Sequence, residues 1–165
     1  MSGAVDDAVG EARLRLDEFL PYRLSVLTNR VSRTLARLYA ERFELTVPQW
    51  RVLAVLGESP GLCADDICRV TEMDKVTVSR AVHGLREQGR VVRHRDPRDG
   101  RRVRIDLTDA GREVYRRVVP LALGFERRLL GALDAGERRQ LDRLLDRLSD
   151  LAGGLEAAGA QEPAR

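Results

Sequence analysis

The sequence predicts a mainly α-helical chain that contains one small β-hairpin. Apolar residues recur at spacings of three and four along most of the 165 residues, which is the period of an amphipathic helix. The period changes to two only within residues 91–107, where a turn containing proline and glycine separates two short alternating runs. Apolar residues form 43% of the chain and charged residues 33%, which is the composition of a globular protein.

Membrane, secretory and disulfide-rich classes are disfavoured. The longest apolar run, residues 118–125, is too short to span a bilayer, and the first residues lack the basic and apolar regions of a secretory signal. The two cysteines, Cys63 and Cys68, are too few for a disulfide framework and lack the spacing of a structural zinc site. We therefore expect a cytoplasmic location, with no membrane partner, no metal and no cofactor.

The first predicted helix is long and follows residues 1–16, which we expect to be disordered or frayed. Pro21 fits the first turn of this helix, where a missing backbone N–H costs little. Its apolar residues recur at spacings of three and four and form a single stripe. The stripe consists of Leu20, Leu24, Leu27, Val31, Leu35 and Leu38.

Three shorter helices are expected next. Thr46 and Gln49 form a capping box that starts the first of them. The other two lie near residues 64–71 and 75–88, and Asp74 is the N-cap of the second. The helix at 75–88 has an apolar stripe that consists of Val78, Ala81, Val82 and Leu85. Its polar face consists of Lys75, Thr77, Ser79, Arg80, His83 and Arg86.

The alternating runs predict a β-hairpin with an arginine-rich tip. Residues 91–95 and 102–107 form its strands, and residues 96–101 form the turn. Three arginines lie in or next to this turn, namely Arg98, Arg101 and Arg102. Basic side chains on an exposed turn are suited to contacting a polyanion.

Two helices complete the chain before a tail, residues 158–165, that we expect to be disordered. Thr108 caps the first of these helices, and Asp134 opens the second. The apolar stripe of the first consists of Val114, Val118, Leu121 and Phe125. That of the second consists of Leu141, Leu144, Leu145, Leu148 and Leu151.

Positive charge is concentrated in one segment. Residues 74–107 hold ten basic and five acidic residues, a net charge of +5, whereas the whole chain carries +3 and the remainder therefore −2. A basic block on a slightly acidic body indicates a surface for a polyanion, although a solvated arginine-rich face would give the same count.

The order of elements is typical of a winged helix-turn-helix. In that fold a recognition helix buries one face and presents a polar face to the major groove. The helix at 75–88 divides in this way, and its capped N-terminus also favours phosphate. The hairpin supplies the wing, whose cations contact phosphates or the minor groove. We therefore expect double-stranded DNA as the partner of the recognition-helix and wing residues.

Two short motifs flank the second strand. Asp96, Arg98 and Arg101 form a D-x-R-x-x-R pattern, and Leu107, Thr108 and Gly111 form an L-T-x-x-G pattern. Together with residues 62–71, 74–82 and 85–91, these motifs make the chain similar to the MarR family of bacterial transcriptional regulators. The resemblance covers roughly residues 18–152. One departure is Gly100, which stands where many members have arginine.

The resemblance implies a homodimeric repressor that binds a pseudo-palindromic operator and is released by a small molecule. It assigns residues 46–108 to the DNA-binding domain, and residues 17–45 and 109–157 to a helical dimerisation region. By the same resemblance, Arg101 would enter the minor groove and Asp96 would brace the wing arginines. The fold class is then mainly α with a small β-hairpin wing, flanked by N- and C-terminal dimerisation helices.

Four residues are candidates for binding a phenolic or anionic aromatic effector. They are Tyr22, Arg23, Trp50 and Tyr115. Aromatic rings and a guanidinium group together can hold such a ligand. The alternative is that the aromatic side chains belong to the core and that Arg23 is a surface charge.

Two other functions remain open. Cys63 lies at a predicted helix N-terminus, where the helix dipole favours a thiolate, so a redox-responsive regulator is one alternative. A winged helix used as a protein-interaction module is the other. An enzyme is not expected, because the Ser, His and Asp candidates, Ser79, His83 and Asp74, lie on the helix assigned to DNA.

Overall fold

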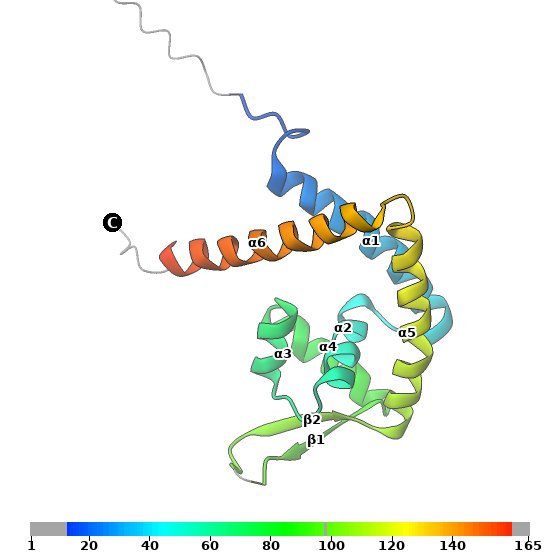
Figure 1. Ribbon diagram of the computed structural model, residues 1–165. Coiled ribbons are helices and arrows are strands. Elements are labelled where there is room, and N and C mark those ends of the chain that lie inside the picture. Colours follow the sequence, from blue (N-terminus) through cyan, green and yellow to red (C-terminus); the bar gives the residue numbers. More distant parts are fainter. Residues whose placement is uncertain (1–12, 98, 160–165) are drawn as a thin grey trace, which may run out of the picture. The chain divides into compact units, whose positions relative to one another are not determined.

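The computed structural model describes residues 13–97 and 99–159, which form two compact units (Figure 1). The first unit ends at Arg116 and the second begins at Arg117, within helix α5. Arg98, residues 1–12 of the predicted frayed segment and residues 160–165 of the predicted tail lie outside the described residues. None of the helices in the described ranges combines the length and the hydropathy needed for a membrane span.

The first helix begins with its apolar stripe, at Leu20, and continues beyond the end of the stripe, at Leu38, to Phe43. α1 spans Leu20–Phe43, with proline in its first turn, and ends at Glu44 in the left-handed conformation. Tyr39 and Phe43 near its C-terminus are buried, whereas most of its N-terminal half is exposed. α1 therefore contributes its last turns to the core of the first unit.

The helix-turn-helix consists of three short helices. α2 spans Val47–Glu58, α3 Ala64–Thr71 and α4 Lys75–Glu87, and α4 packs against both of the others. The predicted capping box of α2 is confirmed: Gln49 N–H donates to Thr46 Oγ1 and Thr46 N–H donates to Gln49 Oε1. The core between these helices consists of Val52, Leu53, Leu56, Ile67, Val78, Ala81, Val82 and Leu85.

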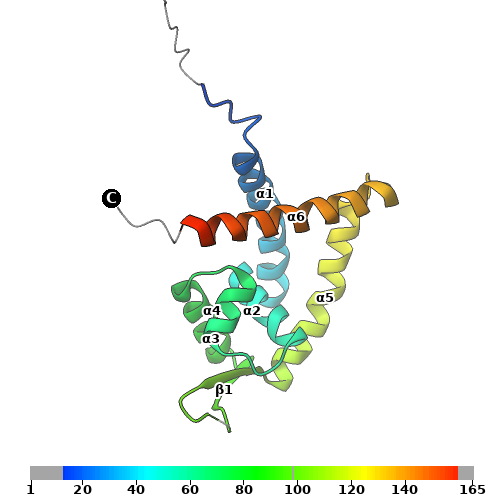
Figure 2. The same cartoon turned by 60° about the vertical axis from the view of Figure 1, so that its left-hand side comes forward.

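The hairpin predicted as a wing is present. β1 (Val91–Arg95) pairs antiparallel with β2 (Val103–Leu107), in the register Val91 to Leu107. A bridge between Leu62 and Ile105 joins β2 to the loop before α3. Figure 2 shows the hairpin extending beyond the group formed by α2, α3 and α4. Its base is therefore attached to the helices while its tip is free to meet a ligand.

Two helices follow the hairpin. Thr108 caps α5 (Asp109–Leu129), since Gly111 N–H donates to its Oγ1 at 3.0 Å. α6 spans Ala135–Gly159 and therefore includes the first two residues of the predicted tail. At its start, Asp134 accepts from Glu137 N–H, and Glu137 accepts in return from Asp134 N–H.

Candidate nucleic-acid interface

The N-terminus of α4 is capped by a charged side chain. Thr77 donates to Asp74 twice: its N–H lies 2.8 Å from Oδ1 and its hydroxyl 2.6 Å from Oδ2. The side-chain hydrogen bond from Thr77, followed by the backbone one, holds the pKa of Asp74 below its ordinary value. Asp74 thus stays ionised and orders the first turn of the helix that would face DNA.

All six residues predicted to read DNA lie on α4. Five of these side chains are exposed, and Thr77 is half-buried with its hydroxyl donated to the cap. The Lys75 ammonium lies 3.1 Å from an Asp65 carboxylate oxygen, and this contact raises the pKa of Lys75. His83 Nε2 lies 3.2 Å from an oxygen of Glu87. Apart from the exposed Val76, this face of α4 is polar, as predicted; its contact with DNA stays a prediction.

A glycine seats α4 closely on α2. A Cβ added at Gly84 would lie 2.6 Å from Nε2 of Gln49, whose side chain is buried and completes the capping box of Thr46. The close neighbour is a side chain of α2. Glycine has a low helix propensity, but a larger residue at position 84 would displace the Gln49 side chain and disturb the start of α2.

The wing is braced by a buried carboxylate. Asp96 is only 5% exposed, and the Nε and Nη2 atoms of Arg104 each lie 2.7 Å from its Oδ2. The brace predicted for Asp96 therefore includes Arg104, which the sequence analysis did not single out. Strand alternation placed Arg104 on the polar side of β2, but nothing local in the sequence indicated its partner.

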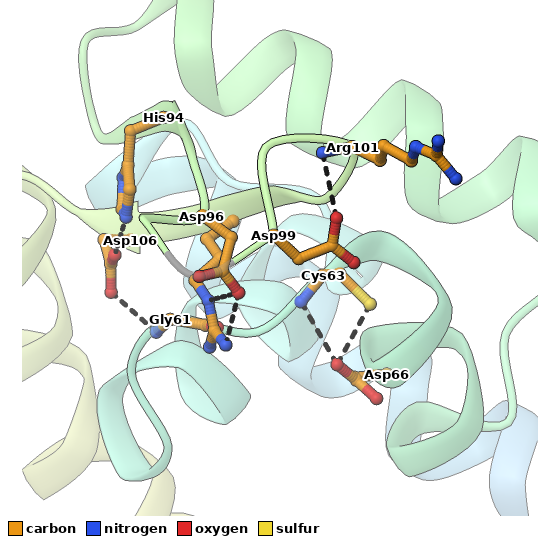
Figure 3. A network of polar contacts seen from close by, with 9 residues as sticks. Gly61, Cys63, Asp66, His94, Asp96, Asp99, Arg101 and Asp106 are labelled. Atoms are coloured by element: carbon orange, nitrogen blue, oxygen red, sulfur yellow. Dashed lines mark hydrogen bonds and ion pairs between the residues drawn. The ribbon is translucent and has the colours of Figure 1, made fainter.

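Residues at the base of the wing form hydrogen bonds with both the N–H and the carbonyl oxygen of Gly61, in the loop before α3. Arg104 Nη1 donates to the carbonyl oxygen of Gly61 at 2.6 Å, and Gly61 N–H donates to Asp106 Oδ1 at 2.6 Å. Ile105, which lies between Arg104 and Asp106 on β2, donates its N–H to the carbonyl oxygen of Leu62 at 2.9 Å. Figure 3 shows the contact of Gly61 with Asp106, whose other oxygen lies 3.3 Å from His94 Nε2.

The wing tip presents cations to solvent. Asp99 orders the turn, since its Oδ1 accepts from Arg101 N–H at 3.1 Å and its carbonyl oxygen accepts from Arg102 N–H at 2.8 Å. Both arginines are exposed, and the Arg101 side chain extends away from Asp99 (Figure 3). Arg98 cannot be placed beside them, since it lies outside the described residues.

The half-buried Cys63 is engaged at the start of α3. Its thiol donates to Asp66 Oδ2 at 3.0 Å, and its backbone N–H donates to the same oxygen at 3.3 Å. These two contacts, with a further one from Arg69, lower the pKa of Asp66. The Cys63 thiol is therefore engaged as a hydrogen-bond donor at the start of α3.

A hollow of about 340 Å³ lies between α1 and α2. Its lining consists of Leu27, Thr28, Val31, Ser32, Leu35, Tyr39, Val47, Trp50 and Arg51. Trp50 forms part of an aromatic row, with its ring centroid 5.4 Å from that of Tyr39 and 6.0 Å from that of Tyr115. Burial raises the pKa of Tyr39, so its phenol is neutral at physiological pH.

The four predicted effector residues do not share this hollow. Tyr22 and Arg23 line a separate one of about 220 Å³, which meets the first at Leu27. Tyr115 stacks on Trp50 but lines a third hollow, of about 230 Å³. Arg51, the one charged group that lines the hollow of Trp50, was not among the residues predicted from the sequence. Its position directly after Trp50 was the available signal.

Metal chemistry finds no support in the part of the chain that the structure describes. There, no group of three or more His, Cys, Asp or Glu side chains is placed to hold a metal ion. The polar groups are arranged instead to cap helices and to brace the wing.

Comparisons with known proteins agree with this geometry. Residues 43–102 match the model of the MarR family. The chain is 33% identical to the HTH-type transcriptional regulator TtmR of Methylorubrum extorquens over 150 residues, 89% of this chain and 73% of that protein. It is 29% identical to the HTH-type transcriptional repressor Rv2887 of Mycobacterium tuberculosis over 131 residues, 79% of this chain and 91% of that protein.

A solved structure is similar over most of the chain. It is that of BpsR from Bordetella bronchiseptica, whose DNA binding is regulated by 6-hydroxynicotinic acid. The TM-score is 0.76 at 25% identity, and the match covers 84% of this chain and 99% of that one. The similarity therefore extends beyond the helix-turn-helix to the flanking helices.

Proposed function

The chain belongs to the MarR family of DNA-binding transcriptional regulators, and from this premise we propose that it is a homodimeric repressor released by a small aromatic acid. One observation carries the DNA-binding part: a hairpin with exposed Arg101 and Arg102 at its tip is fixed at its base to the loop before α3. A fixed base and a cationic tip suit insertion along phosphates or into a minor groove. The same family membership places the chain among regulators and not among enzymes.

The homodimer is supported by exposed apolar side chains on two helices. The exposed leucines of α6 recur at helical spacing, and the N-terminal half of α1 is also exposed. In α6 they are Leu144, Leu145, Leu148, Leu151 and Leu155. Contiguous apolar surface of this kind marks an interface. A twofold assembly would hold two α4 helices about 34 Å apart, which fits a pseudo-palindromic operator.

The effector class is supported by the chemistry of the hollow between α1 and α2. Trp50 and apolar side chains suit an aromatic ring, and Arg51 and the hydroxyl groups of Thr28 and Ser32 suit a carboxylate. We propose a small aromatic acid as ligand. Arg51→Ala should abolish the rise in melting temperature that such an acid gives the wild type, and an undiminished rise would exclude this hollow.

Operator binding is tested by titrating the protein against its own upstream promoter fragment at two salt concentrations. Arg101→Ala should weaken binding roughly tenfold or more and reduce the slope of log affinity against log salt by about one per half-site. Arg139→Ala removes an arginine of α6 that is also exposed, and serves as the matched control. Equal affinities for Arg101→Ala and wild type would refute the role of the wing. If the winged helix is instead a protein-interaction module, no promoter fragment should bind specifically.

A further inference from the structure

The exposed face of α4 contains one apolar side chain that no described contact explains. Val76 is 57% exposed, and it is the single exposed large apolar residue of α4, all of which the structure describes. Val76, Arg80 and His83 lie at i, i+4 and i+7, so they share one face of the helix. The buried stripe that begins at Val78 lies on the opposite side. Val76 is thus at the centre of the face that is directed away from the core.

Its neighbours in the first turn are engaged within the chain. Lys75 pairs with Asp65, and the Thr77 hydroxyl is donated to Asp74. Arg80, one turn later, is exposed. The first turn therefore offers one apolar group flanked by cations, at the N-terminal end, where a recognition helix contacts base edges.

We propose that Val76 contacts the 5-methyl group of a thymine in each half-site of the operator. The proposal rests on the proposed operator binding by α4. Thymine is the one base that presents an apolar group on its major-groove edge, so it is the natural partner of an exposed aliphatic side chain. A β-branched residue in a helix keeps essentially one rotamer, so Val76 presents its methyl groups with little loss of side-chain entropy.

The test removes only the 5-methyl group of a thymine from the DNA. Duplexes that the wild type binds are selected from a random pool, and each thymine of the half-site is then replaced by deoxyuridine. Replacement of thymine by deoxyuridine at one symmetric position should weaken wild-type binding about fourfold per half-site. This is the factor for burying one methyl-sized apolar group. Val76→Ala should bind the thymine and deoxyuridine forms of that position equally. Val76→Thr, which keeps one methyl group, should retain part of the discrimination.

Val70→Ala is the matched control. Val70 is 58% exposed but lies at the end of α3, so its replacement should leave the thymine-to-deoxyuridine ratio of the wild type unchanged. Melting temperatures of all variants establish that they fold.

The outcomes separate this inference from the function beneath it. Failure of the wild type to select any duplex overturns the proposed function. Selection of a duplex in which no deoxyuridine weakens binding, or in which Val76→Ala keeps the wild-type ratio, overturns the role of Val76 alone.

Discussion

A single missing methyl group fixes how α5 begins. A Cβ at Gly111 would collide with the carbonyl oxygen of Arg90, at the junction with β1. That carbonyl accepts from Thr108 N–H at 3.1 Å, and Gly111 N–H donates to Thr108 Oγ1. The L-T-x-x-G motif thus has a physical reason: threonine caps the helix, and glycine lets the helix lie against the strand end.

Gly111→Ala should therefore lower the free energy of unfolding by about 1–3 kcal/mol, since the obstacle is backbone and cannot rotate away. Gly153→Ala is the control, because a Cβ there meets nothing within 4 Å in α6. That change should raise the free energy of unfolding by up to about 1 kcal/mol through helix propensity. Urea titrations compare the two, and equal stabilisation would contradict the collision.

At the scale of the element, α4 depends on the charge of its cap. The hydrogen bonds from Thr77 hold the pKa of Asp74 below its ordinary value of 3.8. A carboxyl group whose pKa is lower in the folded state stabilises the fold above its unfolded pKa. That contribution is lost as the pH falls through the folded value.

Asp74→Ala should accordingly be less stable than wild type at neutral pH, and the difference should shrink as the pH falls below 3.8. Asp74→Asn keeps an acceptor without the charge, so its stability should lie between the two. Urea titrations from neutral pH down to about 3 measure the difference. A gap that stays constant over this range would show that the charge of Asp74 contributes nothing.

The elements themselves were predictable, because each is encoded in neighbouring residues. The capping box of Thr46, the cap of Asp74 and the alternation in the hairpin are all local patterns, and all three are confirmed. The wing brace was less accessible. Arg104 contacts Gly61, which precedes it by 43 residues, and only the folded chain brings them together. The lining of the hollow between α1 and α2 was the hardest to predict, since it depends on packing that the sequence does not display.

At the scale of the whole molecule, the apolar stripe of α6 sets the expected assembly. Leu151 is 62% exposed, and Leu148 and Leu155 lie one turn to either side of it. Leucine at such spacing is stable on a surface chiefly when a second apolar face covers it.

Leu151→Glu should convert the proposed dimer to a monomer and reduce operator affinity, because one α4 reaches only one half-site. Asp146→Lys changes the charge by two units, against one unit for Leu151→Glu, but lies on the opposite side of α6 and should leave both properties intact. Sedimentation velocity and promoter titration measure the two properties. A dimer that persists in Leu151→Glu would exclude this stripe as the interface.

The two hydrogen bonds of Gly61 with β2 also bear on how the hairpin is connected to α2. α2 ends at Glu58, and three residues later both faces of the chain are tied to β2 through Arg104 and Asp106. The loop that follows α2 is therefore connected to the second strand of the hairpin by these two hydrogen bonds. We expect a displacement of the end of α2 to change the position of the hairpin through them.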